Sequence, residues 1–279
     1  MREPSPYAGE TVVFATMHGK ERLAQPAFAE RLGAAVVAPE LLDTDRFGAF
    51  AGDVPRTLSP RAAAVTKARL GLELTGAQLG LASEGTFSSV LGLGVENREV
   101  LVFIDDARGL ELVEFSTQSS PLPPSRNIRT VADAADYARA IGFPRQGVII
   151  RAELGSNVLT HKNMTTEAAL IDAVERGLVD GMSVAILPDY RAHRSPSRAE
   201  HIRSLCERMA ARLATPCPNC SAPGFGLVDV ERGLPCSLCG SLTDTIAAYV
   251  RGCGACDYRE RRPGEFTAAD PSLCDWCNP

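Results

Sequence analysis

Four Cys-x-x-Cys motifs lie near the C-terminus: Cys217-Pro-Asn-Cys220, Cys236-Ser-Leu-Cys239, Cys253-Gly-Ala-Cys256 and Cys274-Asp-Trp-Cys277. They use eight of the nine cysteines of the chain. Two thiolates separated by two residues can face one cation, and two such pairs complete a tetrahedral site with four sulfur ligands. A disulfide framework is the alternative, but Met1 to Glu10 lacks a signal-peptide pattern, and repeated pairs of this kind favour metal. The sequence therefore predicts two zinc ions.

The pairing of the four motifs is open. Successive pairing joins the first motif to the second and the third to the fourth, whereas interleaved pairing joins the first to the third and the second to the fourth. The gaps of 15 residues after Cys220 and 17 residues after Cys256 both suit a short hairpin, which favours successive pairing. A site with four cysteines has no open position for water or substrate. We therefore expect both ions to be structural and the function to lie upstream.

Composition indicates a cytoplasmic α/β protein. The 279 residues suffice for one substantial domain and one small domain, here 1–213 and 214–279. No apolar run approaches the length of a membrane span, so we expect no membrane partner. The net charge of −5 argues against nucleic-acid binding. The zinc-ribbon domain has five Lys and Arg residues against eight Asp and Glu residues, which strengthens that argument.

The N-terminal residues follow a strand-helix-strand pattern. The apolar, β-branched run Thr11–Thr16 predicts a buried strand, a helix continues to about Leu32, and Ala34–Ala38 predicts a second strand. Pro26 is expected to interrupt that helix or to mark its start. A helix from Ser59 or Pro60, a strand over 77–82, a hairpin over 100–116 and further helices and strands follow. The pattern predicts a mixed-sheet α/β domain followed by a small zinc-ribbon domain with two zinc sites.

Polar segments follow three of the predicted strands. They are Thr16 to Glu21, the loop Asp43 to Arg56, and Ser83 to Thr86. Strand ends in α/β folds converge on one ligand site, and carboxylates beside Lys and Arg suit a magnesium ion that holds a phosphorylated substrate. The predicted catalytic carboxylates are Glu84, Asp45 and Asp53. The predicted substrate-binding residues are Thr16, His18, Lys20, Arg56 and Lys67.

Part of this order resembles the inosine triphosphate pyrophosphatase superfamily. The matching motifs are Thr16, His18 and Lys20 after the first strand, Ala64-Val65-Thr66-Lys67-Ala68, and Ala82-Ser83-Glu84-Gly85. The resemblance covers about residues 11–116 and implies hydrolysis of a nucleoside triphosphate with magnesium bound at the acidic turn. The later base-recognition segment of that family is not found, although His193 and Arg194 could take part of its role.

The whole chain also resembles a bacterial family known as a domain of unknown function. The matching segments are Asp43-Thr44-Asp45 with Phe47-Gly48, Ala82 to Gly85, Arg191 to Arg198 and the ending Cys274 to Pro279. This resemblance implies no activity. The segment Arg191 to Arg198 precedes a predicted helix with a capping box at Ser197 and Glu200. Its Arg191, His193 and Arg198 are predicted to close over a bound anion, or else to form a connection whose arginines pair with surface carboxylates.

Two functions follow as expectations. The first is a magnesium-dependent hydrolase of a nucleotide or related phosphorylated small molecule. The second is a non-catalytic binding or assembly protein, in which the zinc ribbons dock a protein partner and the α/β domain binds a ligand. The first predicts that Glu84, Lys20 and the loop aspartates cluster. The second predicts an exposed apolar patch on the ribbons around Phe225 or Trp276.

Overall fold

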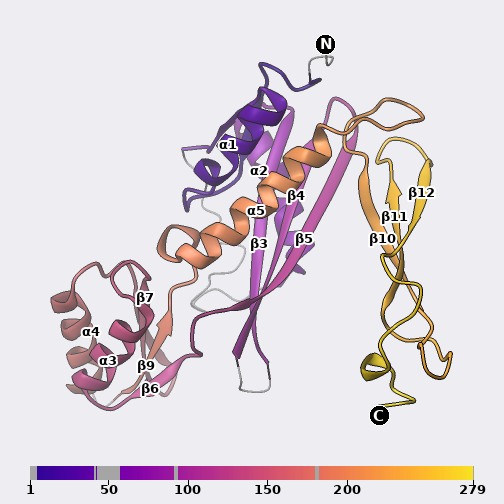
Figure 1. Cartoon of the computed structure of the whole chain (residues 1–279). Coiled ribbons are helices and arrows are strands. Elements are labelled where there is room, and N and C mark those ends of the chain that lie inside the picture. Colours follow the sequence, from indigo (N-terminus) through magenta and orange to yellow (C-terminus); the bar gives the residue numbers. More distant parts are fainter. Residues whose placement is uncertain (1–4, 41, 43–56, 91–93, 180–181, 279) are drawn as a thin grey trace.

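The computed structural model describes residues 5–40, 42, 57–90, 94–179 and 182–278. These residues form three β-sheets, and helices pack against two of them (Figure 1). The helices are α1 (Glu21–Leu32), α2 (Pro60–Thr75), α3 (Val131–Ile141), α4 (Glu167–Val179) and α5 (Pro196–Leu213). The predicted α/β class with a mixed sheet is confirmed.

The largest sheet has the strand order β2-β1-β3-β4-β5. Its strands are β1 (Thr11–Phe14), β2 (Ala35–Val37), β3 (Leu79–Val90), β4 (Gly94–Asp105) and β5 (Leu110–Ser120). β1 runs parallel to β2 and β3, whereas β3, β4 and β5 are antiparallel. The chain passes from β1 through α1 to one side and from β2 through α2 to the other side. The gap between β1 and β3 is therefore a topological switch point, where open α/β sheets bind ligands.

Different helices cover the two faces of this sheet. Successive side chains of a strand point to opposite faces. Leu101 and Phe103 of β4 accordingly pack in a core with α1 and α5, whereas Val102 and Ile104 pack in a core with α2. In Figure 1, α5 crosses in front of the long strands beside α1. Along β3 and β4, alternate polar side chains therefore point to different helices, one set to α1 and α5 and the other set to α2.

Local signals explain the helix boundaries, with two corrections. Ser59 caps α2 by accepting a hydrogen bond from the amide of Ala62, and Pro60 occupies the first helical position. Pro26 does not start α1, because the helix begins at Glu21 and continues through it. The predicted capping box of α5 is also wrong: the helix begins at Pro196 after Ser195, two residues earlier than a cap at Ser197 requires.

A second sheet is inserted between β5 and α5. Its strands are β6 (Arg126–Ile128), β7 (Val148–Leu154), β8 (Asn157–His161) and β9 (Ser183–Pro188), in the antiparallel order β6-β9-β7-β8. α3 and α4 pack together and enclose a separate core with this sheet. Residues 1–213 thus contain two sheets, and the predicted domain boundary after residue 213 stays a prediction.

The third sheet belongs to the cysteine-rich C-terminus. β10 (Gly226–Arg232), β11 (Ile246–Gly252) and β12 (Arg259–Pro263) form an antiparallel ribbon that Figure 1 shows beside β5. The described residues also include two short 3-10 helices, η2 (Ala192–Arg194) and η3 (Pro271–Leu273). Among the helices described, none combines the length and apolarity needed to cross a membrane.

Candidate functional site

The candidate site lies at the switch point, directly after β1. β1 pairs with β3 only as far as Phe14, whereas β3 continues to Val90. The segment that follows β1 therefore lies beside the part of β3 that begins at Ser83. The Thr16 hydroxyl accepts a hydrogen bond from the amide of His18, at 3.1 Å, and so shapes this segment. This is the position at which the sequence predicts ligand-binding groups, and that role stays a prediction.

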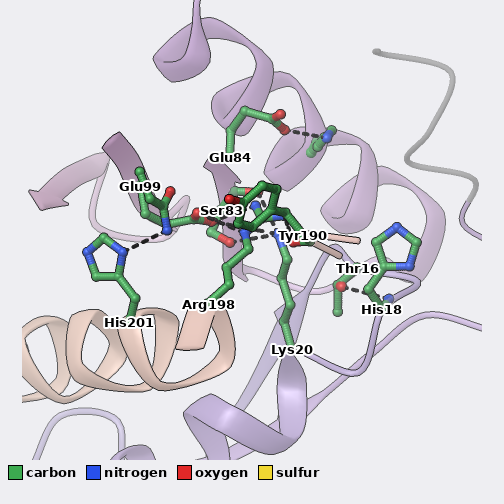
Figure 2. A network of polar contacts seen from close by, with 11 residues as sticks. Thr16, His18, Lys20, Ser83, Glu84, Glu99, Tyr190, Arg198 and His201 are labelled. Carbon is green, nitrogen blue, oxygen red and sulfur yellow. Dashed lines mark hydrogen bonds and ion pairs between the residues drawn. The ribbon is translucent and has the colours of Figure 1, made fainter. Parts of the chain in front are cut away.

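Lys20 joins the end of β1 to β3. Its ammonium group donates to the backbone carbonyl of Ser83 at 3.1 Å and to the Ser83 hydroxyl at 2.9 Å (Figure 2). It lies 3.9 Å from the carboxylate of Glu99. Burial and the nearby positive charge of Arg198 lower the pKa of Lys20 from 10.5 to about 8. Lys20 is thus a buried cation that neighbouring groups only partly stabilise.

Glu99 and Arg198 form the centre of the cluster. Arg198 of α5 donates from Nε and Nη2 to the two oxygens of Glu99, each at 3.1 Å, and from Nη1 to the carbonyl of Tyr190 at 2.7 Å. Burial alone would raise the pKa of Glu99, but Arg198 and Lys20 outweigh it and lower that pKa. Arg198 also lies over the Phe87 ring, which stacks on Tyr190 at 3.9 Å. The guanidinium is thereby fixed on several sides.

Glu84 lies on the opposite face of the sheet. It alternates with Ser83 along β3, so its side chain points to α2, where Lys67 donates to it at 2.5 Å. The prediction that Glu84 ends a strand is wrong, because β3 pairs with β4 well beyond it. The carboxylates of Glu84 and Glu99 are thus each paired with a cation, Glu84 with Lys67 and Glu99 with Arg198. These residues alone do not form a magnesium site, and the only metal-type clusters among the described residues are cysteines.

A histidine-asparagine pair lies beside Glu99 on the α5 face. The Nδ2 of Asn97 and the Nδ1 of His201 are 2.9 Å apart, and both residues are buried. Burial lowers the pKa of His201, which favours the neutral ring. Asn97 Oδ1 and His201 Nε2 have no hydrogen-bond partner among the described residues. The pair extends the polar cluster along α5.

The segment between β9 and α5 faces the segment after β1. The rings of His18 and His193 stack with centroids 5.0 Å apart. Desolvation and the proximity of His18 lower the pKa of His193 to about 4, although part of its ring is exposed. Arg191 is held differently, by a two-point pair with the buried Asp189 and a hydrogen bond of 2.8 Å to Asn163. Arg191 therefore braces the inserted sheet.

The structure gathers most of the predicted site residues that it describes. Thr16, His18, Lys20, His193 and Arg198 come together between β1, β3 and α5, with Glu84 and Lys67 on the opposite face of β3. Asp45, Asp53 and Arg56 lie outside the described residues.

Glu99, Asn97 and His201 were missed by sequence reasoning. A signal existed for His201, because it precedes Leu205 by four residues and so falls on the buried stripe of α5. Glu99 lies two residues before Leu101 and four before Phe103 on the same strand, so its side chain points to the same buried face as theirs. This alternation is a second signal that sequence reasoning could have used.

The eight C-terminal cysteines form two compact clusters. Cys217, Cys220, Cys253 and Cys256 make one, and Cys236, Cys239, Cys274 and Cys277 make the other, with all sulfur atoms of a cluster within 4.8 Å of one another. The closest sulfur pairs are 3.6 to 3.8 Å apart. Four sulfurs about 2.3 Å from a tetrahedral zinc lie about 3.8 Å apart, whereas a disulfide needs about 2.05 Å. The clusters therefore fit two zinc ions.

The pairing is interleaved, which corrects the preference for successive pairing. β10 carries the chain away from the first motif, and β11 returns it antiparallel to β10. The third motif therefore meets the first at one end of the ribbon, and β12 carries the fourth motif back to the second at the other end. A seven-residue strand spans roughly 23 Å, so the 15-residue gap after Cys220 is a strand connection rather than a local hairpin.

A family profile described as Domain of unknown function (DUF6671) matches residues 67–279. A search of curated proteins finds no match to the chain. The resemblance to the inosine triphosphate pyrophosphatase superfamily receives no support from these comparisons and stays a prediction. The profile covers Lys67, the whole of β3 to β5, Arg198 and both cysteine clusters, which is well over half of the chain. The protein therefore belongs to the family described as Domain of unknown function (DUF6671).

Proposed function

We propose that the cluster of Lys20, Ser83, Glu99 and Arg198 binds a phosphorylated small molecule, and that the chain hydrolyses it. The observation that carries the proposal is the buried Lys20 ammonium group at the switch point, with its pKa lowered to about 8. A buried ammonium beside a second cation gains stability when an anion arrives. Phosphate oxygens accept such charge-assisted hydrogen bonds.

The charge balance of the cluster supports an anionic ligand. Within this cluster, Lys20 and Arg198 contribute two positive charges and Glu99 contributes one negative charge, which leaves one positive charge in excess. His18 follows β1 and His193 precedes α5, and their rings stack. Lys20 would stabilise charge on the phosphoryl oxygens, and Arg198 would hold Glu99 away from them.

The proposed reaction is hydrolysis of a bond between phosphorus and oxygen. Water adds hydroxide to phosphorus, the bond from phosphorus to the leaving oxygen breaks, and the leaving oxygen takes a proton. The carboxylates of Glu84 and Glu99 do not need a magnesium ion to balance their charge, because Lys67 and Arg198 already neutralise them. We therefore assign no step to Mg²⁺, and its use would depend on Asp45 and Asp53.

The test is release of phosphate and pyrophosphate from a panel of standard and deaminated nucleoside triphosphates, with and without magnesium. The intact chain is compared with Lys20→Met and with the control Lys162→Met, a lysine next to β8. We expect turnover that Lys20→Met abolishes and Lys162→Met preserves. Binding of pyrophosphate without release of products would favour the non-catalytic alternative. If a folded, zinc-loaded chain neither binds pyrophosphate nor releases products, the proposed phosphate site is contradicted.

A further inference from the structure

The two cysteine clusters lie in different surroundings. The first cluster is docked on the α/β part: Arg212 of α5 donates to the carbonyl of Gly224 at 3.1 Å and to the carbonyl of Val113 in β5 at 3.0 Å. Phe225 is only 2% exposed, which corrects its predicted place in an exposed patch. The second cluster lies at the other end of the ribbon, near the C-terminus (Figure 1).

The residues around the second cluster, 233–245 and 264–278, are here called the second zinc lobe. This lobe carries large apolar side chains that solvent reaches. They are Trp276 at 81% exposed, Leu242 at 77%, Leu238 at 74%, Phe266 at 69% and Leu273 at 59%. Small soluble domains rarely gather so many exposed apolar side chains unless something binds them.

Leu238 and Trp276 occupy matching places in the two motifs of this lobe. Each is the residue before the second cysteine of its motif, and the four sulfur atoms of the cluster lie within 4.8 Å of one another. The two side chains are therefore presented from the same small metal-centred unit. In the first cluster the same positions hold Asn219 and Ala255, which are not large apolar residues. The apolar surface is specific to the second zinc lobe.

The negative charge of the lobe indicates a positively charged partner. It contains Asp244, Glu265, Asp270 and Asp275 and no lysine or arginine. Four thiolates with one Zn²⁺ would add a net charge of −2. The basic residues at its border are paired: Arg232 lies 3.5 Å from Asp244, Arg261 lies 2.6 Å from Glu231, and Arg262 lies 3.0 Å from Glu260. Such a surface repels nucleic-acid phosphates and anionic lipids.

We propose that the second zinc lobe binds a basic segment of a partner protein, one in which lysines or arginines alternate with apolar residues. The apolar side chains of the segment cover Trp276 and Leu238, and its cations face Glu265 and Asp275. The surface is independent of the cluster between β1 and α5, so it stands whether or not that cluster binds phosphate. Aromatic residues in apolar surroundings commonly dominate the energy of such interfaces.

The chain contains one tryptophan, so its intrinsic fluorescence reports on this surface directly. The probe is a synthetic 15-residue peptide of alternating lysine and leucine, added to the full-length, zinc-loaded chain. We expect the emission of Trp276 to shift to shorter wavelength as its exposed ring becomes covered. Peptides of alternating glutamate and leucine, and of lysine and serine, should produce no shift. Added salt should weaken binding of the lysine-leucine peptide.

Variants locate the binding surface. With a fluorescein-labelled peptide, Leu238→Ser and Trp276→Ala should each weaken binding about tenfold or more. The control Phe115→Ser changes a phenylalanine of β5 that is 68% exposed elsewhere, and should leave binding unchanged. Zinc content of two per chain confirms that each variant is folded. Equal binding of the glutamate-leucine peptide, or unchanged binding by both lobe variants, would overturn the proposal. So would self-association in light scattering that Leu238→Ser abolishes, since it would identify a second copy as the occupant.

Discussion

Arg198 and Glu99 meet in a two-point ion pair that lies directly against the backbone of Gly85. The guanidinium and the carboxylate share two contacts of 3.1 Å, and both side chains are at least nine-tenths buried. Gly85 is the cross-strand neighbour of Glu99 in the register of β3 and β4. The glycine of the Ser-Glu-Gly motif is therefore explained by close approach of an ion pair rather than by a turn.

Gly85→Ala should destabilise the protein. A Cβ at this position would overlap Glu99 Oε2 and lie 2.5 Å from Arg198 Nη2, so the pair or the strand would have to move. Overpacking of this kind costs about 1–3 kcal/mol in the free energy of unfolding. Gly94→Ala in β4 is the control, because a Cβ there meets no atom of the described residues within 4 Å. Urea unfolding of both variants measures the difference, and equal stability would contradict the proposed packing.

Removing one partner of the pair should cost more than removing both. Arg198→Met leaves the Glu99 carboxylate buried with Lys20 as its remaining ion-pair partner among the described residues, and loss of one partner of a buried pair costs about 3–5 kcal/mol. The double variant Glu99→Leu with Arg198→Met leaves no buried carboxylate at this position and should lose less. A double-mutant cycle measured by urea unfolding gives the coupling energy. A double variant less stable than Arg198→Met would show that the pair is not the reason for the loss.

Sequence patterns predicted the residue types of this cluster better than its geometry. Lys20 was predicted because it follows a recognisable strand, and Arg198 because it lies at the start of a recognisable helix. Lys67 was predicted because it falls in a helical motif that resembles the inosine triphosphate pyrophosphatase superfamily. Glu84 was misplaced because the run of apolar residues ends at Ala82, although residues 83–85 are still buried and strand pairing continues to Val90. Hydrogen bonds between strands, rather than hydrophobic periodicity, hold residues 83–90 extended. A search for the periodicity of apolar residues cannot detect such a segment.

Lys20 should make stability depend on pH in the alkaline range. Its pKa is lowered to about 8 in the folded protein against an ordinary value of 10.5, so the unfolded chain binds this proton more tightly. Unfolding then takes up a proton between these values, and the free energy of unfolding rises with pH by up to about 1.4 kcal/mol per unit. The contribution is fully present above 10.5 and lost as the pH falls through 8.

The measurement compares urea unfolding of the native chain and Lys20→Met from pH 7.5 to 10.5. Other groups titrate in this range, but they are common to both proteins, so the difference between the curves isolates Lys20. Lys162→Met should follow the native curve. Parallel curves for the native chain and Lys20→Met would show that the pKa of Lys20 is not lowered in the folded state.

The spacing of the cysteines in the sequence predicted the metal ligands but not which motifs share an ion. Eight ligands could be identified because Cys-x-x-Cys is a contiguous signal. Their partners could not, because the choice depends on whether the intervening residues turn back at once or extend as a strand. Leu227 to Arg232 do extend, paired with β11, and this places Cys236 at the far end of the ribbon from Cys220.

Zinc counts in paired variants should distinguish the two pairings. Cys220→Ser and Cys256→Ser each remove a ligand of the first cluster, so each single variant and the double variant should retain one zinc ion per chain. Cys220→Ser combined with Cys239→Ser removes a ligand from each cluster and should retain none. Successive pairing reverses these outcomes, since Cys220 and Cys239 would then share an ion and Cys220 and Cys256 would not. Elemental analysis of the purified variants after dialysis provides the counts, with Cys206→Ser as the control that should retain both ions because Cys206 lies buried in α5, outside both clusters.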